Sequence, residues 1–252
     1  MSTYSISLKD IDKIDFIVTE GMTAKQVYDK YKPNYIINGA LYDFATKTNI
    51  TYAKDEGVKS GYLFSQEGIA FNEDNSIEWC TKDSATRDFI AGSPCLVKNG
   101  SKYIEWGNKV SSYIDGSHKR SCIGFNDTHL FLFASDNETT IDETANNCIK
   151  LGMKYAINLD GGGSCHLQKD TTIVKSSSRA NVSWILVYLK KQVSDTTSKV
   201  EANKVTVKCG DAEQDGYIEN GVTYVPIRFI AEALGASVLW DGVNKVVTVT
   251  KK

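Results

Sequence analysis

Short runs of β-branched and aromatic residues recur along the first three quarters of the chain, and Gly, Asn and Asp separate them. Runs of this length, bounded by turn-forming residues, are typical of β-strands. The clearest runs are Asp15–Val18, Tyr35–Ile37, Leu130–Ala134, Tyr155–Leu159 and Trp184–Leu189. The pattern predicts a domain built mainly from short strands that are joined by tight turns.

Two segments predict helices. Thr23–Tyr31 is the first, and Thr23 is placed to cap it. Thr140–Leu151 is the second, in which Thr140 and Glu143 have capping-box spacing and apolar residues at 141, 145, 148 and 149 form a stripe. The fold class that we expect is therefore α+β, a mixed and sheet-rich domain with few helices.

The composition changes after the last long strand. Residues 192–203 are polar and contain no large apolar cluster, which is typical of a linker. The residues that follow predict strand 204–208, a helix from Ile227 to Leu234 with Gly235 as its stop, and a hairpin around residues 241–244. We expect a domain at 1–191, a linker at 192–203 and a small α+β domain at 204–252.

Composition excludes several classes of partner. The 252 residues are 41% hydrophobic and 24% charged with a net charge of −2, which implies no general attraction to nucleic acid. No stretch approaches the roughly 18 apolar residues that span a bilayer, and Met1–Asp10 lacks the pattern of a signal peptide. We therefore expect synthesis in the cytoplasm without export by the usual route and no membrane insertion.

The six cysteines are scattered, and no two of them have C-x-x-C spacing. Zinc clusters normally place ligands two to four residues apart, so the spacing argues against structural zinc. Several of the cysteines lie in apolar runs, as Cys122 does, where a free cysteine behaves as a small hydrophobe. A reduced environment is the simpler interpretation, and disulfide formation is the alternative that the sequence leaves open.

The sequence Asn158-Leu159-Asp160-Gly161-Gly162-Gly163-Ser164 is the most informative motif. An apolar strand leads directly into a carboxylate and three consecutive glycines. Each glycine loses much backbone entropy on folding, so a triple glycine is expected where the backbone takes positive φ or comes very close to another group. A ligand site and a purely geometric turn are both compatible with this motif.

Five blocks in order resemble the phosphodiester glycosidase family. They are Tyr35–Asp43, Ala91–Gly100, Ser117–Gly124, Asn158–Ser164 and Arg179–Val182. Departures from the family pattern occur at Lys119, where proline is usual, at Ser121-Cys122 and at Cys165-His166. The resemblance covers nearly 190 residues and implies a hydrolase of sugar 1-phosphodiesters, of the N-acetylglucosamine-1-phosphodiester type, that releases sugar and a phosphomonoester.

The resemblance also implies a site. Its catalytic candidates are Asp160, Asp136, Arg120 and His118. Its substrate-binding candidates are Asn38, Asp43, Gly161, Gly162, Gly163, Ser164 and Arg179.

Each candidate has a chemical reason. Because a phosphomonoester is a good leaving group, charge stabilisation matters more than general acid catalysis. A guanidinium at Arg120 suits a phosphate, the amides of Gly161–Ser164 could form an anion nest, and two carboxylates could activate water and assist departure. Asn38 and Asp43 would bind sugar hydroxyls.

Plainer roles compete with these assignments. Arg120 could be an ion-pair partner, Asp136 and Asn38 turn residues, and His118 a structural histidine. No cofactor is required for this chemistry, and a divalent cation near Asp160 or Asp136 stays open.

Residues 204–252 resemble the copper amine oxidase N-terminal domain family through Asn220–Ala236 and Val238–Asp241. The chain has no histidine after His166, so this part offers no copper site of the usual kind. The resemblance implies a module that binds a Gram-positive cell-wall polymer or associates with itself. Together with the absent signal peptide, this resemblance suggests the hypothesis that the protein is a bacteriophage product, either released by lysis or carried on a virion.

Two other functions stay open. Cys165-His166 suggests a thiol protease, but adjacent residues of an extended chain face opposite sides, so the cysteine would need His118 or His129. The second alternative is a non-catalytic glycan-binding component of a phage tail or a cell-wall assembly. The presence of both Asp160 and Arg120 argues against that alternative.

Overall fold

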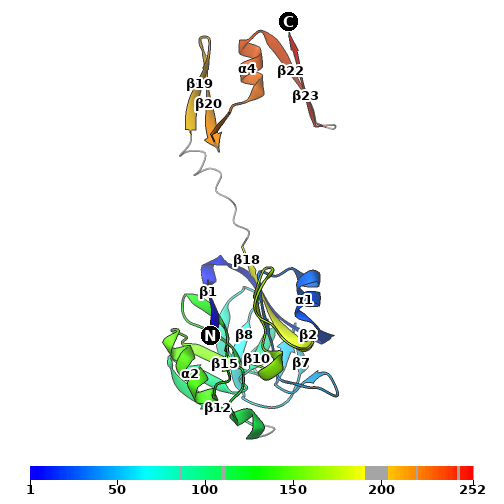
Figure 1. Cartoon of the computed structure of the whole chain (residues 1–252), viewed down its shortest axis with the longest axis vertical. Helices are drawn as coiled ribbons and strands as arrows, with labels where there is room; N and C mark the ends of the chain where they lie inside the picture. Colours follow the sequence, from blue (N-terminus) through cyan, green and yellow to red (C-terminus); the bar gives the residue numbers. More distant parts are fainter. Residues whose placement is uncertain (86, 109–111, 191–203, 220, 243–244, 252) are drawn as a thin grey trace. The chain divides into compact units, whose positions relative to one another are not determined.

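The computed structural model describes residues 1–85, 87–108, 112–190, 204–219, 221–242 and 245–251. The chain forms two compact units, Met1–Lys190 and Lys191–Lys252, and Figure 1 labels their helices and strands. Strands account for 53% and helices for 14% of the structure, so the predicted sheet-rich α+β class is confirmed. The predicted linker at 192–203 lies outside the described residues.

Three antiparallel sheets form the N-terminal unit. The first has the strand order β1 (Ser2–Ser7), β14 (His129–Ala134), β13 (Ser121–Phe125), β15 (Tyr155–Asn158), β11 (Cys95–Lys98) and β12 (Ser101–Glu105). The second has the order β7 (Val58–Ser60), β6 (Ala53–Asp55), β10 (Asp88–Ala91), β8 (Glu67–Phe71) and β9 (Ile77–Thr81). The third has the order β17 (Thr172–Lys175), β16 (Leu167–Lys169), β3 (Tyr35–Asn38), β18 (Asn181–Leu189) and β2 (Ile11–Met22).

Shorter elements complete this unit. A separate hairpin joins β4 (Tyr42–Asp43) to β5 (Thr48–Asn49). Single-turn 3-10 helices lie at Leu8–Asp10, Ser112–Asp115 and Gly162–Ser164.

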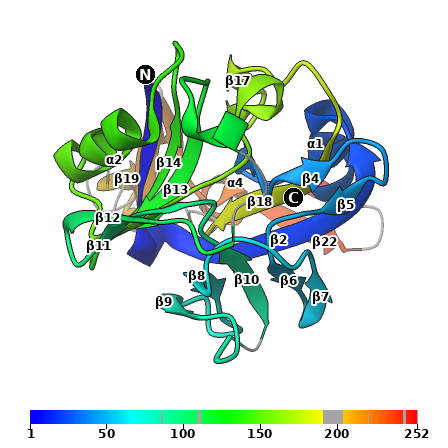
Figure 2. The same cartoon turned by 90° about the horizontal axis from the view of Figure 1, so that it is seen from below.

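Both predicted helices of this unit are present, α1 (Ala24–Tyr31) and α2 (Ile141–Lys150). Each begins with a capping box, from Thr23 in α1 and from Thr140 with Glu143 in α2, as the spacing predicts. Figure 2 shows that the two helices lie on different sides of the unit. Helix α2 packs against β11 and β12, and α1 packs against β3 and β18. No helix among the described residues combines the length and the apolar character needed to cross a membrane.

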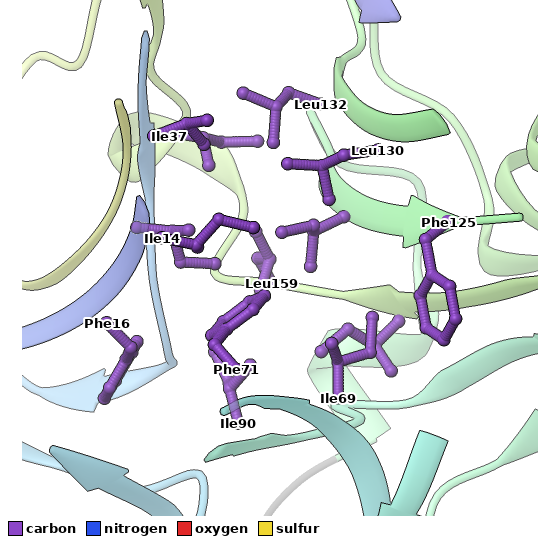
Figure 3. Close-up of a cluster of buried hydrophobic side chains, with 14 of the residues drawn as sticks. Ile14, Phe16, Ile37, Ile69, Phe71, Ile90, Phe125, Leu130, Leu132 and Leu159 are labelled. Atoms are coloured by element: carbon purple, nitrogen blue, oxygen red, sulfur yellow. The ribbon is translucent and has the colours of Figure 1, made fainter. Parts of the chain in front are cut away.

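The core lies where the three sheets face one another. Its side chains come from all three sheets and point toward one another in Figure 3, which labels Ile14, Phe16, Ile37, Ile69, Phe71, Ile90, Phe125, Leu130, Leu132 and Leu159. Such a cluster is stabilised by removal of apolar area from water, at roughly 25 cal/mol per Å². Leu159 belongs to this cluster, so the packed core fixes the backbone immediately before Asp160.

The C-terminal unit contains the strand, the helix and the hairpin that the sequence predicts, together with two further strands. They are β19 (Lys204–Cys209), β20 (Ala212–Glu219), β21 (Val222–Tyr224), α4 (Ile227–Ala233), β22 (Ala236–Asp241) and β23 (Val246–Lys251). The first three strands form one sheet and the last two a hairpin. Pro226 is the N-cap of α4, and Gly235 takes φ +79° where the helix stops.

Candidate active site

A pocket of about 280 Å³ opens where β3 and β15 end and β13 begins. Its lining residues are Leu41, Tyr42, Phe44, Ser93, Ile114, His118, Arg120, Asn158, Leu159, Asp160, Gly161, Gly162 and Arg179. Five segments that are distant in sequence thus meet at one point. The structure brings together Asp160, Arg120, His118, Gly161, Gly162 and Arg179 from the predicted set.

The glycine segment is shaped by close approach and by backbone conformation. Gly162 has φ +58°, a left-handed conformation that favours glycine. A Cβ on Gly163 would lie 2.2 Å from Nη2 of Arg179, so only glycine allows the guanidinium to come this close. The triple glycine therefore serves both the turn and the placement of an arginine.

Three of the four amides of the predicted anion nest are already bonded within the protein. The Gly161 amide donates to Asp160 Oδ1 at 2.9 Å, and the Gly162 amide donates to the Lys119 carbonyl at 2.8 Å. The Ser164 amide donates to the Gly161 carbonyl at 3.1 Å. Neither Gly163 nor Ser164 lines the pocket.

Asp160 offers a carboxylate to the pocket. Its backbone amide donates to the Gly39 carbonyl at 3.0 Å, which joins the loop after β15 to the loop after β3. Burial raises the pKa of Asp160 to about 6, and the Gly161 amide and the charge of Arg179 oppose that rise. Near neutral pH the group is therefore poised to exchange a proton.

Arg120 is a buried cation, with only 3% of the residue exposed. Its guanidinium donates from Nε to the Thr139 carbonyl at 3.3 Å and from Nη2 to the carbonyls of Ile114 at 3.0 Å and Gly116 at 2.5 Å. Among the described residues it forms no ion pair, and its Nη1 donates to no protein acceptor. Burial lowers the pKa of Arg120, and the charge of Asp115 opposes that effect only in part.

A second arginine lies at the rim. The Arg179 guanidinium stacks over the Phe44 ring at 4.7 Å, and Phe44 makes an edge contact with Tyr42 at 4.9 Å between centroids. Tyr42 donates from its hydroxyl to the Ala180 carbonyl at 2.9 Å. Because 56% of Phe44 is exposed, the rim presents an aromatic surface beside a cation.

His118 is half-buried and lines the pocket. Its backbone pairs with Thr139 through two hydrogen bonds, of 3.2 and 2.9 Å. This pairing holds the segment before β13 against the segment before α2, and it places His118 and Arg120 on the same wall.

Asn38 does not line the pocket, and this corrects its predicted role in sugar binding. The residue is fully buried, and its Nδ2 donates to the Asp160 carbonyl at 2.8 Å. Its Oδ1 accepts from Ser121 Oγ at 2.8 Å and from the His166 amide at 2.9 Å. Since both ends of its amide are engaged, Asn38 positions Asp160 rather than meeting a ligand.

Asp43 and Asp136 also lie outside the pocket lining. Asp43 accepts from the amides of Thr46 and Ala45, which lowers its pKa, so it closes the β4–β5 turn. Asp136 contacts the N-terminal ammonium group and Ser2 Oγ, and these contacts lower its pKa. The structure therefore does not place Asp136 beside Asp160 as a second catalytic carboxylate.

Apart from the aromatic rim, Asn158 and Ser93 are polar pocket residues that the sequence prediction of the site does not include. Asn158 ends β15, and its Nδ2 donates to the carbonyls of Ser93 and Leu159, each at 2.7 Å. Its Oδ1 has no partner among the described residues, although it is buried. The place of Asn158 in the glycine motif is visible in the sequence, but the fixed orientation of its amide is not.

The Cys165–His166 pair does not support a thiol protease. Burial raises the pKa of Cys165 to about 11, which disfavours a thiolate. His166 Nδ1 accepts from the Ser177 amide at 3.3 Å, and Nε2 lies 3.0 Å from Gln168 Oε1. Both ring nitrogens are therefore engaged in the scaffold.

A carboxylate cluster that could suit a metal ion lies elsewhere in the part of the chain that the structure describes. Asp15, Glu56 and Asp88 bring oxygens within 4.8 Å of one another. Arg87 Nη2 lies among them, at 2.5 Å from Asp15, 3.3 Å from Glu56 and 3.4 Å from Asp88. An arginine thus supplies the positive charge of this cluster, and Asp160 is the carboxylate that lines the pocket.

Two family models match the sequence, one in each part of the chain. The family model described as phosphodiester glycosidase matches residues 13–188, and the chain belongs to this family. The family model described as copper amine oxidase N-terminal domain matches residues 199–252. No curated protein has significant sequence similarity to the chain.

Solved structures share the fold at low identity. The zebrafish N-acetylglucosamine-1-phosphodiester alpha-N-acetylglucosaminidase catalytic domain, auto-inhibited by its pro-peptide, has a TM-score of 0.61 and 13% identity. That match covers 75% of this chain and 83% of the zebrafish chain. A hypothetical protein from Synechocystis has a TM-score of 0.53 and 12% identity, with 75% and 59% covered. At these identities the likeness concerns the fold.

Proposed function

We propose that the N-terminal unit hydrolyses sugar 1-phosphodiesters of the N-acetylglucosamine-1-phosphodiester type and releases sugar and a phosphomonoester. The observation that carries this proposal is the buried guanidinium of Arg120 on the pocket wall, which forms no ion pair with a carboxylate of the described residues. Burying a charge without a partner is costly. A phosphodiester anion in the pocket would remove that cost and accept from the open Nη1 group.

Asp160 would supply the acid–base chemistry. A departing phosphomonoester is a weak base, so the reaction needs no proton donor at the leaving oxygen. One carboxylate then suffices, either to take a proton from the attacking water or to stabilise the positive charge that develops at the anomeric carbon. No metal or other cofactor takes part in this scheme.

The remaining pocket groups would hold the two parts of the substrate. Asn158 Oδ1 is a buried acceptor without a partner in the described protein, and a sugar hydroxyl could donate to it. Arg179 is near enough to Asp160 to lower the pKa of that carboxyl, and it stacks on Phe44. It would contact a phosphate oxygen or the aglycone at the rim.

The C-terminal unit would direct this activity to a surface glycan, and a Gram-positive cell-wall polymer is the proposed target. The support for this role is the match of residues 199–252 to the copper amine oxidase N-terminal domain family. The test mixes the intact protein with purified cell walls and measures how much protein sediments with them. Protein that stays in the supernatant at every wall concentration would contradict the targeting role.

The test of the activity is a discontinuous assay with N-acetylglucosamine-1-phosphodiester compounds and phosphodiester-linked wall polymers. Free sugar and phosphomonoester should appear in equal amounts, and Asp160→Asn should reduce the formation of both by at least about 100-fold. Asp136→Asn is the matched control, because Asp136 lies outside the pocket lining. Tight binding of these compounds without any product would instead favour the alternative function, a glycan-binding component of a phage tail or a cell-wall assembly.

A further inference from the structure

Ser164 has a buried hydroxyl group that does not line the pocket. None of the residue is exposed, and its Oγ has no hydrogen-bond partner among the described residues. Its backbone is occupied, because the amide donates to the Gly161 carbonyl at 3.1 Å and the carbonyl accepts from Asn181 Nδ2 at 3.0 Å. A buried hydroxyl without a partner is costly, so its place beside the pocket needs a physical reason.

The Asp160 carboxylate has a free oxygen close to this hydroxyl. Asp160 Oδ1 accepts from the Gly161 amide at 2.9 Å, whereas Oδ2 accepts from no donor in the part of the chain that the structure describes. Burial raises the pKa of Asp160 to about 6, and the Ser164 hydroxyl is the largest of the effects that lower it. The hydroxyl therefore lies within reach of the carboxylate.

A second acceptor competes for the Ser164 proton. Burial and the charge of Asp160 raise the pKa of Tyr42 above its ordinary 10.0, and Ser164 is among the groups that lower it. The Tyr42 hydroxyl donates its own proton to the Ala180 carbonyl at 2.9 Å, so its oxygen is left to accept from Ser164. An ionised carboxylate is a stronger acceptor than a neutral phenol oxygen. The Ser164 proton therefore favours Asp160 once Asp160 is charged.

We propose that Ser164 is a positioning residue, whose hydroxyl donates to Oδ2 of Asp160 when that carboxylate is ionised. This inference rests on the proposed function, in which Asp160 acts on the substrate. Since both carboxylate oxygens then have donors from one loop, the group keeps one orientation toward the pocket. Ser164 touches no substrate in this arrangement, in contrast to the substrate-binding role that the family resemblance implies.

The other groups around the pocket limit how the effect can be measured. Arg120 and Arg179 are cations throughout the range in which Asp160 titrates. Burial raises the pKa of Cys165 to about 11, so its thiol is neutral there. His118 lines the pocket, and an unperturbed histidine titrates at about pH 6.5. Activity alone therefore does not isolate Asp160, and the titration of its carboxyl group must be observed directly.

The test is an NMR titration of the Asp160 carboxyl carbon in protein with isotopically labelled aspartate, with Asp160→Asn to assign the signal. Wild type should titrate at about 6. Ser164→Ala should raise the midpoint by about one pH unit, because the ionised form loses a hydrogen bond. Ser164→Cys keeps the shape with a weaker donor and should give a smaller shift in the same direction. This second variant decides the matter if the alanine variant does not fold.

Ser65→Ala is the matched control. Ser65 is a buried serine whose hydroxyl contacts the Glu105 carboxylate, and neither residue lines the pocket. This variant should lose stability and leave the Asp160 midpoint unchanged. Steady-state kinetics add a second readout. Above about pH 8, Ser164→Ala should lower kcat about 10-fold and leave KM within about 2-fold, because orientation is lost but no substrate contact is removed.

The possible outcomes separate this inference from the proposed activity. An Asp160 midpoint that is the same in wild type and in the Ser164 variants, or that moves equally in Ser65→Ala, would overturn the role of Ser164. Turnover by wild type would then leave the proposed activity standing. A midpoint that shifts as expected, in a protein that cleaves no phosphodiester, would instead support the contact between Ser164 and Asp160 and contradict the proposed activity.

Discussion

Two buried arginines in the N-terminal unit differ in their partners, and the difference distinguishes a functional side chain from a structural one. Arg87 lies among Asp15, Glu56 and Asp88, whereas Arg120 meets only backbone carbonyls. Burial by itself would lower the pKa of Arg87, but the neighbouring carboxylates outweigh it and raise that pKa. For Arg120 the effect of burial is larger than that of the neighbouring groups, so its pKa is lowered.

The difference also extends to two aspartates. Burial raises the pKa of Asp88 and of Asp160 to about 6 in each case. Asp88 is fully buried beside Arg87 and accepts from the amides of Phe16 and Glu56. Its carboxylate oxygens therefore interact with groups of the protein itself. Asp160 faces the pocket. A perturbed pKa therefore marks function only where the group also meets an open cavity.

The largest expected effect comes from the same substitution made in both places. Asp160→Asn should reduce turnover by at least about 100-fold and leave the fold intact, because it removes the acid–base group and keeps its shape. Asp88→Asn should leave turnover of the folded enzyme within about 3-fold and lower the thermal midpoint instead. Turnover and unfolding are measured on both variants, and an active Asp160→Asn would exclude Asp160 from the mechanism.

The second contrast removes the guanidinium groups. Arg87→Met should destabilise the fold by about 3 kcal/mol, because three carboxylates lose their shared cation. Arg120→Met should reduce kcat/KM for a phosphodiester by about 100-fold and change the unfolding midpoint much less, since no carboxylate is left unpaired. Steady-state kinetics and denaturant unfolding separate the two effects. If Arg120→Met unfolds as easily as Arg87→Met, the charge of Arg120 serves the scaffold.

The third prediction concerns pH. Asp160 should work as a carboxylate, so kcat/KM should rise as pH increases through about 6. The pKa of Asp88 is higher in the folded state than the ordinary value of 3.8, so the folded state holds its proton more tightly. Its stabilising contribution is complete below pH 3.8 and is lost as pH rises to about 6, by roughly 3 kcal/mol.

Activity and stability should therefore change in opposite directions over one pH range. Unfolding free energies of wild type and Asp88→Asn, measured from pH 4 to pH 7, isolate the stability effect as the difference in slope. Parallel curves for the two proteins would contradict the assignment to Asp88. A kcat/KM that falls as pH rises through 6 would instead make Asp160 a proton donor.

Local patterns carried the fold prediction. The caps at Thr23 and Thr140 and the strands predicted at Tyr35–Ile37 and Tyr155–Leu159 follow from neighbouring residues in the sequence. The structure confirms the two caps and places the strands at Tyr35–Asn38 and Tyr155–Asn158. What failed depends on contacts between distant segments. The Asp136 carboxylate contacts the N-terminal ammonium group. The Asn38 amide is fully hydrogen-bonded to groups at positions 121, 160 and 166.

The sequence predicts those residues of the candidate site that lie inside a recognisable motif. Asp160 lies in the glycine motif, and Arg120 lies in a block with a clear family resemblance. The sequence does not show which hydrogen-bond donors of a side chain remain without an acceptor after the chain folds. The rim formed by Phe44 and Arg179 joins residues 135 positions apart, which no local pattern relates.

The smallest expected effect tests that rim. Phe44→Ala removes the ring on which Arg179 stacks, and an exposed cation–π contact of this kind contributes about 0.5–1 kcal/mol. KM for a phosphodiester should rise about 3- to 5-fold with kcat unchanged, because Arg179 is held less firmly and the scissile bond is untouched. Val58→Ala is the control, since Val58 is 71% exposed and is not among the pocket residues. An unchanged KM in Phe44→Ala would show that the rim does not contact the substrate, and the contrast between the two arginines would then rest on Arg120 alone.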